Sequence, residues 1–111
     1  MSGTGLLGDF EQLVLLAVLR RADQAYALPI RTEIEEATER TVSRGALYRT
    51  LDRLEDKGLV ASRIEEPTPE RGGHARKAFS VTRDGVEALR RSRDVVSRLS
   101  DGLEDVLEGA R

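Results

Sequence analysis

Residues 43–58 read Ser-Arg-Gly-Ala-Leu-Tyr-Arg-Thr-Leu-Asp-Arg-Leu-Glu-Asp-Lys-Gly and predict one short helix, capped at both ends. Ser43 suits the N-cap, because its hydroxyl can accept a hydrogen bond from an unpaired amide in the first turn. Gly58 is placed to end the helix. Three leucines recur at i, i+4 and i+7, which puts them on one face. The other side carries arginines and a tyrosine, a shape that fits a DNA major groove.

A second helix is predicted just before this one, over residues 29–39. Pro29 suits its first position, because the ring fixes a helical φ angle and an N–H is not needed there. Residues 40–42 make a short turn, so the two helices form a helix-turn-helix. The buried stripe of the earlier helix is expected to be Ile30, Ile34 and Ala37, with Glu33, Glu36 and Glu39 facing solvent.

Two short strands are predicted after the helix-turn-helix. Residues 59–64 and 75–81 both alternate in a β-like pattern, and Phe79 and Val81 fall on one face. Residues 65–73, between them, hold two prolines and two glycines and are expected to form a loop. A hairpin beside a helix-turn-helix is the winged-helix arrangement. The predicted fold class is therefore mainly α with a small β-hairpin.

The first helix is predicted over residues 10–21, with Asp9 as its cap and Gln12 as the capping-box partner. Residues 13–19 are apolar on every side of that helix. A helix of this kind must be covered all round. In so small a domain, we expect the second cover to come from another subunit.

The last helix is predicted to start after Thr82 and to carry a seven-residue apolar repeat. Its spacing predicts a dimerisation helix over residues 83–111, following a winged helix-turn-helix DNA-binding domain over residues 1–82. The apolar face formed by this repeat could instead pack on the chain's own first helix. We expect it to contact both that helix and a second subunit. Gly102 invites a bend. The repeat consists of Leu89, Val96, Leu103 and Ala110, and, offset by three, Ser92, Leu99 and Val106.

The amino-acid composition argues against several classes of protein and kinds of site. The chain has 111 residues, no cysteine and one histidine, which excludes disulfides, thiolate chemistry and most imidazole metal sites. The sequence has no Gly-rich phosphate loop and no paired-carboxylate motif, so we expect neither an enzyme nor a cofactor. The longest apolar run is seven residues, against about 20 for a membrane span, and the start lacks a secretory signal. We therefore expect a cytoplasmic protein with no membrane partner.

The net charge of −2 hides a local asymmetry. Residues 41–82 carry eight Lys or Arg against six Asp or Glu, an excess of two positive charges. Contacts to phosphate depend on such a local surface more than on the total charge. The acidic total nevertheless keeps a second hypothesis open: a winged-helix protein–protein interaction module that does not bind DNA.

The ordered motifs resemble the PadR family of bacterial transcriptional regulators, in the short form with a single C-terminal dimerisation helix. Residues 45–60 look like the family's recognition helix entering the first wing strand, and residues 77–85 like its second wing strand entering the last helix. The resemblance implies a homodimer that binds operator DNA and usually represses transcription. Two departures are Ala27, where the family commonly has glycine, and Phe79, where tyrosine is usual.

Many members release DNA when a small, frequently aromatic, molecule binds near the dimer interface. This chain has only four aromatic residues, which gives an aromatic-lined pocket little support. A small aliphatic effector pocket near Phe10, Leu13 and the last helix stays open, as does control by expression level alone.

The candidate DNA-contacting residues fall into two groups. We expect Arg44 and Arg49 to read base edges, and Ser43, Tyr48 and Arg53 to contact phosphates. For Arg53 the alternative is a surface pair with Asp56, and for the wing it is a solvated tip. The full DNA set is Ser43, Arg44, Gly45, Tyr48, Arg49 and Arg53 on the helix, and Arg71, His74, Arg76 and Lys77 on the wing. The dimerisation set is Phe10, Leu13, Leu16, Leu89, Val96, Leu99, Leu103 and Val106.

Overall fold

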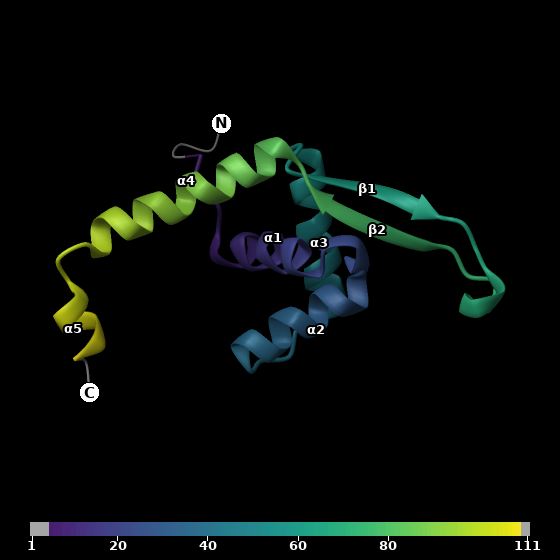
Figure 1. Ribbon diagram of the computed structural model, residues 1–111, viewed down its shortest axis with the longest axis horizontal. Coiled ribbons are helices and arrows are strands. Elements are labelled where there is room, and N and C mark those ends of the chain that lie inside the picture. Colours follow the sequence, from purple (N-terminus) through teal and green to yellow (C-terminus); the bar gives the residue numbers. More distant parts are fainter. Residues whose placement is uncertain (1–4, 110–111) are drawn as a thin grey trace.

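A computed structural model describes residues 5–109 of the chain and shows helices and a two-stranded hairpin (Figure 1). Three helices form a small body, the hairpin projects from one side of it, and a long helix leaves from the other. In chain order the elements are α1 (Asp9–Arg21), the 3₁₀ turn η1 (Ala22–Gln24), α2 (Ala27–Thr38), α3 (Arg44–Asp56), β1 (Val60–Glu65), the 3₁₀ turn η2 (Pro69–Arg71), β2 (Arg76–Val81), α4 (Arg83–Ser100) and α5 (Glu104–Glu108).

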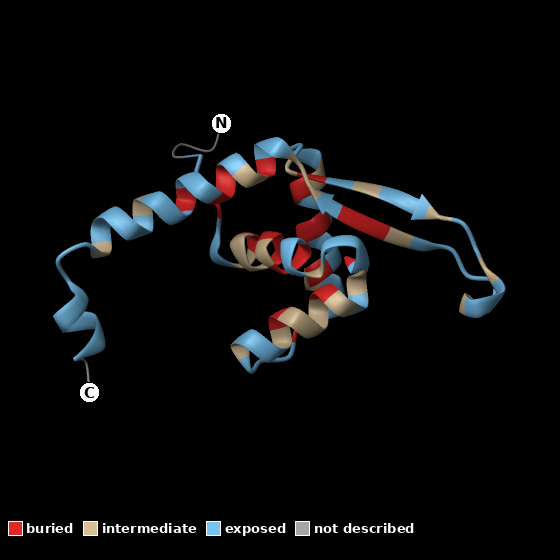
Figure 2. Cartoon of the chain, viewed as in Figure 1, coloured by how far each residue is buried: buried red, intermediate tan, exposed pale blue. Residues whose placement is uncertain are grey.

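The core lies where α1, α2 and α3 meet (Figure 2). The predicted leucine stripe of α3 is confirmed, since all three leucines are at most 1% exposed. Removing that much apolar surface from water favours folding by about 1.5–3 kcal/mol for each leucine. The other side chains of the core centre come mainly from α1 (Val14, Leu15, Val18) and α2 (Ile30, Ile34).

The hairpin confirms the winged helix-turn-helix predicted from the sequence. Its strands are antiparallel, in a register that runs from Val60 opposite Val81 to Glu65 opposite Arg76. At the base, the amide of Phe79 donates to the carbonyl of Ala25 at 2.9 Å, and Tyr26 bridges to Ala78. The strand β2 is thereby tied to the segment that leads into α2, while the tip extends away from the body.

The start of α4 is packed closely against the end of α3. The Thr82 hydroxyl accepts from the amide of Gly85 at 3.0 Å and donates to the carbonyl of Gly58 at 2.7 Å. A Cβ placed on Gly85 would lie 2.1 Å from the Leu59 carbonyl oxygen, so this approach requires glycine. Farther along α4, Ser92 is buried and its hydroxyl accepts from the amide of Leu7 at 3.0 Å.

The first helix begins differently from the prediction. Its cap is Gly8, and Asp9 is the first helical residue. The carboxylate of Glu11, not the amide of Gln12, accepts from the Gly8 amide at 3.0 Å. Gly8 has no side chain to accept a hydrogen bond from the Glu11 amide, the other half of a capping box, and for this reason the sequence pattern pointed to Asp9.

The second helix begins two residues before the predicted start, because Pro29 occupies its third position and not its first. None of the first amides of a helix has an intrahelical partner, so proline costs no hydrogen bond there either. Two side chains also lie differently from the prediction. Ala37 is exposed, and Glu33 is half-buried because Arg20 and Arg21 both hold its carboxylate at 2.8 Å.

The C-terminal helix predicted over residues 83–111 is divided into two helices near Gly102, where the sequence indicated a bend. The helix α4 ends at Ser100, Gly102 takes a φ of +85°, and the short α5 follows. The residues of the seven-residue repeat therefore do not share one helix face. Leu89 and Ser92 are buried in the chain's own body, whereas the later ones are exposed, and Ala110 lies outside the described residues. Within residues 5–109, no helix combines the length and the apolar character needed to cross a bilayer.

Candidate nucleic-acid interface

The exposed face of α3 carries the helix residues predicted to contact DNA. Ser43 caps the helix as predicted, its hydroxyl accepting from the amide of Ala46 at 3.0 Å. Arg44, Tyr48 and Arg49 are exposed, because the leucine stripe takes the opposite face into the core. Among the ion pairs of the described residues, none involves Arg44 or Arg49. The two guanidinium groups therefore present their full charge to solvent.

Gly45 leaves room for the side chain of Arg49. These residues are four apart and so share a face of α3. A Cβ on Gly45 would lie 3.1 Å from a terminal nitrogen of Arg49, which is closer than ordinary van der Waals contact. The guanidinium of Arg49 thus rests over the bare backbone at Gly45.

Arg53 sits in an ion-pair cluster that the sequence did not reveal. Its Nε lies 3.4 Å from the Glu11 carboxylate, and Lys57 Nζ lies 2.9 Å from the same oxygen. The predicted alternative partner, Asp56, is not the one that pairs with it. Burial by itself would raise the pKa of Glu11, but the hydrogen bond and charge of Lys57, the Gly8 amide and Arg53 hold that pKa below its ordinary value. The cluster ties the start of α1 to the end of α3.

A second cluster sets the position of the wing. The Tyr26 hydroxyl donates to Oε1 of Glu65 at 3.0 Å, and Arg76 Nε donates to the same oxygen at 3.1 Å. Arg76 also stacks on the Tyr26 ring, 3.8 Å from its centroid, and Arg63 binds the second oxygen of Glu65 at 3.0 Å. The hydrogen bonds from Arg76 and Tyr26 hold the pKa of Glu65 below its ordinary value. Arg76, predicted as a DNA contact, is thus also a link between β2 and α2.

The remaining wing residues lie at the tip and along β2. Arg71 donates to the carbonyls of His74 and Glu66, so its side chain closes the tip turn. His74 is exposed. Lys77 is half-buried, with its amine 5.7 Å from the centre of the Phe79 ring. The structure therefore places the predicted wing residues along one arm, at different distances from α3.

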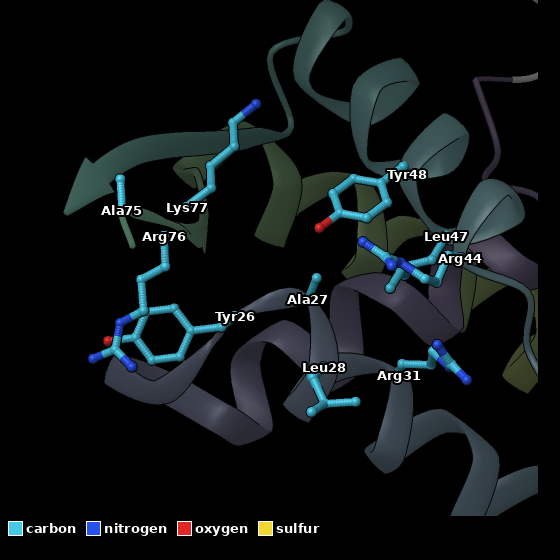
Figure 3. Close-up of a pocket in the computed structure, with 10 residues that line it drawn as sticks. All are labelled: Tyr26, Ala27, Leu28, Arg31, Arg44, Leu47, Tyr48, Ala75, Arg76 and Lys77. Atoms are coloured by element: carbon cyan, nitrogen blue, oxygen red, sulfur yellow. The ribbon is translucent and has the colours of Figure 1, made fainter. Parts of the chain in front are cut away.

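A cleft of about 500 Å³ separates α3 from the wing (Figure 3). Its lining includes the first turn of α2 and the side chains of two tyrosines, Tyr26 and Tyr48. The charged residues that line it are all cations: Arg31, Arg44, Arg76 and Lys77. Sequence reasoning missed Tyr26, Arg31 and Glu65, since no local motif marks them. The pairing of Glu65 with Arg76 would follow from the strand register alone.

The predicted dimerisation residues form two separate apolar surfaces. Phe10, Leu13 and Leu16 on α1 are half-buried and border two adjoining clefts of about 410 and 430 Å³ beside α2. The cleft at Phe10 and Leu13 is walled by α2 and the turn before α3, not by the last helix as expected for an effector pocket. The other surface is on α4 and α5, where the exposed apolar residues are Val96, Leu99, Leu103, Val106 and Leu107. Leu89 belongs to neither surface, because it is buried in the core.

Titratable side chains show no metal-binding arrangement in the part of the chain that the structure describes. No group of three or more His, Asp or Glu residues converges there. The charged clusters around Glu11, Glu33 and Glu65 are each satisfied by cations.

Three helices with a hairpin wing, and an α3 that exposes Arg44 and Arg49 to solvent, define a winged-helix protein of the kind found among transcriptional regulators. The sequence matches the transcriptional regulator PadR-like family over residues 15–91. Because that match covers more than half of the chain, the protein belongs to the PadR-like family of transcriptional regulators.

A curated relative is also a transcriptional regulator. The chain is similar to transcriptional regulator YqjI of Escherichia coli (strain K12), with 31% identity over 101 residues that cover 89% of this chain and 45% of YqjI. The chain thus spans about half the length of the curated relatives that it matches.

Solved structures are similar over most of the chain. A PadR-like transcription factor from Bacteroides fragilis has 27% identity and a TM-score of 0.72, covering 87% of this chain and 88% of its own. A PadR family transcriptional regulator from Eggerthella lenta has 28% identity and a TM-score of 0.65, covering 87% and 82%.

The Glu11 cluster predicts a pH-dependent stability. A carboxylate whose pKa is lowered in the folded state stabilises the fold above its ordinary pKa of 4.5, and this stabilisation is lost as pH falls through the lowered value. Glu11→Gln should lower the free energy of unfolding by about 1 kcal/mol near pH 7 and by much less near about pH 3. Urea denaturation followed by circular dichroism across this range measures both. Glu87→Gln, in an exposed pair with Arg90, is the control. Parallel pH profiles for Glu11→Gln and the parent would contradict the prediction.

Proposed function

We propose that this protein is a homodimeric, sequence-specific DNA-binding repressor that acts in the cytoplasm. The observation that carries the proposal is the exposed face of α3. Arg44 and Arg49 lie there without a carboxylate partner among the described residues, on a helix whose other face is fixed in the core. An α-helix fits the major groove of B-DNA, where arginine can grip the O6 and N7 atoms of guanine.

The wing supports a second set of contacts. Arg71, His74 and Lys77 lie along the hairpin, which projects away from the three-helix body (Figure 1), and glycines at the tip adopt positive φ angles that let the backbone approach a neighbouring surface. Arginine in such an arm favours narrow minor grooves. The wing would therefore contact the duplex beside the groove that α3 enters.

Dimerisation is the second part of the proposal. In the protomer, Val96 and Leu99 of α4 are 60% and 75% exposed, and Leu103 and Val106 follow with 46% and 67%. An apolar surface of this kind, on a helix that projects from the body, is typical of an interface. A second copy would cover it, and the half-buried face of α1 would take part. A two-fold pair then presents two copies of α3 to half-sites about one helical turn apart.

The domain assignment follows from this proposal, with one refinement. We assign residues 1–82 to DNA binding and residues 83–111 to dimerisation. However, Ala88, Leu89 and Ser92 of α4 are buried in the body. The first half of α4 therefore belongs to the core of the DNA-binding unit, and the dimer surface begins beyond it.

The net charge of −2 favours the other candidate, a winged-helix module that binds a protein and not DNA. Binding to duplex DNA separates the two candidates. A fluorescence-anisotropy titration of the protein with duplexes from its own upstream region should give an affinity that falls linearly with salt concentration on logarithmic axes. A shuffled duplex of the same composition is the control and should bind more weakly. Absence of binding at about 50 mM salt would favour the protein-binding module.

Gly45→Ala should separate stability from DNA binding. An alanine in an exposed helix is more stable than glycine by about 0.5–1 kcal/mol, so the free energy of unfolding should rise. The new methyl group displaces the Arg49 guanidinium, so affinity for operator DNA should fall. The affinity loss should disappear when Gly45→Ala is combined with Arg49→Ala, because the two act through one side chain. Additive losses would show that Gly45 acts through its own contact with DNA.

Leu99→Glu tests the dimer. The Leu99 side chain is exposed in the protomer, so a charge there should leave the protomer fold intact but oppose burial against a second copy. Light scattering should show the mass falling from dimer to monomer, with an unchanged far-ultraviolet circular dichroism spectrum. Ser97→Glu, at an exposed polar position on the same helix, is the matched control. An unchanged dimer mass for Leu99→Glu would remove this surface from the interface.

A further inference from the structure

We propose that the cleft between α2, α3 and the wing seats one phosphodiester of the DNA backbone, and that Arg44 holds this phosphate and does not read a base. The inference rests on the proposed DNA-binding function. It reassigns Arg44, which the sequence grouped with Arg49 as a base reader, and it gives a role to a cleft that the sequence did not predict.

The charge of the cleft fits a single anion. Its charged lining residues are all cations. Two of them are compensated, since Arg31 pairs with Glu35 at 3.5 Å and Arg76 pairs with Glu65 at 3.1 Å. Arg44 and Lys77 have no carboxylate partner among the described ion pairs. The uncompensated positive charge therefore lies at the α3 and β2 walls.

The directions of the side chains support the same ligand. In Figure 3, Arg44 and Tyr48 extend from α3 into the cleft, and the stacked pair of Arg76 and Tyr26 forms the opposite side. A guanidinium and a phenol hydroxyl are both hydrogen-bond donors, and an arginine fork matches the oxygens of a phosphate. The first turn of α2 lies between them, so the positive end of that helix dipole faces the same space.

The shape of the cleft separates Arg44 from Arg49. A hollow of about 500 Å³ with walls on two sides can admit the phosphate that protrudes from a duplex, but not the edge of a paired base inside a groove. Arg49 lies elsewhere on α3, with its guanidinium over Gly45. It is absent from the cleft lining. Arg44 is thus placed to set the register of α3 on the DNA, and Arg49 to give sequence preference.

Two measurements test this division of roles. Operator duplexes carrying one neutral methylphosphonate at a time should reveal one position in each half-site where neutralisation weakens binding by the parent protein about tenfold. In Arg44→Ala, neutralising that phosphate should no longer change the affinity. The substitution should also weaken binding to operator and shuffled duplexes by the same factor, and reduce the slope of log affinity against log salt concentration by about 1. Arg44→Lys should keep most of the salt slope, because it keeps the charge.

Arg49→Ala is the matched control on the same helix. It should keep the response to the neutralised phosphate and lose the preference for operator over shuffled DNA. The phosphate assignment would be overturned if Arg44→Ala lost this preference or kept the methylphosphonate response. It would also be overturned if Arg44→Ala bound DNA like the parent. Failure of the parent to bind any duplex would instead refute the proposed function itself. Thermal unfolding of each variant checks that the exposed substitutions leave the fold intact.

Discussion

The packing of three leucines under α3 is the constraint on which the rest of the structure depends. Leu47, Leu51 and Leu54 are almost completely buried, and together they fix the rotation of the helix about its axis. A shift by one residue would turn the helix by about 100° and carry all three out of the core, at a cost of several kcal/mol. Because this burial fixes the rotation of the helix, Arg44 and Arg49 are held on its solvent-exposed face. The charged face is thus a consequence of the apolar one.

Apolar spacing, capping residues and turn residues predicted most of this fold. Where these local patterns misplaced the start of a helix, the cause was also local. The bounds of α3, its Ser43 cap and the two wing strands all follow from spacing, capping and turn chemistry within a few residues. The starts of α1 and α2 were misplaced for a similar reason. Gly8 caps without a side chain, and proline is tolerated at more than one position in a first helical turn, so neither residue marks the boundary uniquely.

The long-range contacts could not be predicted from the sequence, because their partners are far apart in the chain. Glu11 meets Lys57 across 46 residues, and Tyr26 meets Glu65 across 39. A sequence displays the charge of Arg53 or Arg76 but not the carboxylate that compensates it. From the sequence alone, Arg53 and Arg76 were therefore predicted to contact DNA together with Arg44 and Arg49. In the structure, Arg53 and Arg76 are paired with carboxylates, whereas Arg44 and Arg49 have no such partner among the described ion pairs.

The apolar repeat that begins in α4 lies on two different surfaces. Its early members pack in the chain's own body, and its later members, from Val96 on, are exposed. The start of α4 is held with little freedom, since Gly85 lies against the Leu59 carbonyl and Thr82 bonds to Gly58. In the proposed dimer, the angle at which α4 leaves this contact sets the separation of the two copies of α3. The tight junction between α3 and α4 would therefore convert the geometry of the dimer interface into the spacing of half-sites on DNA.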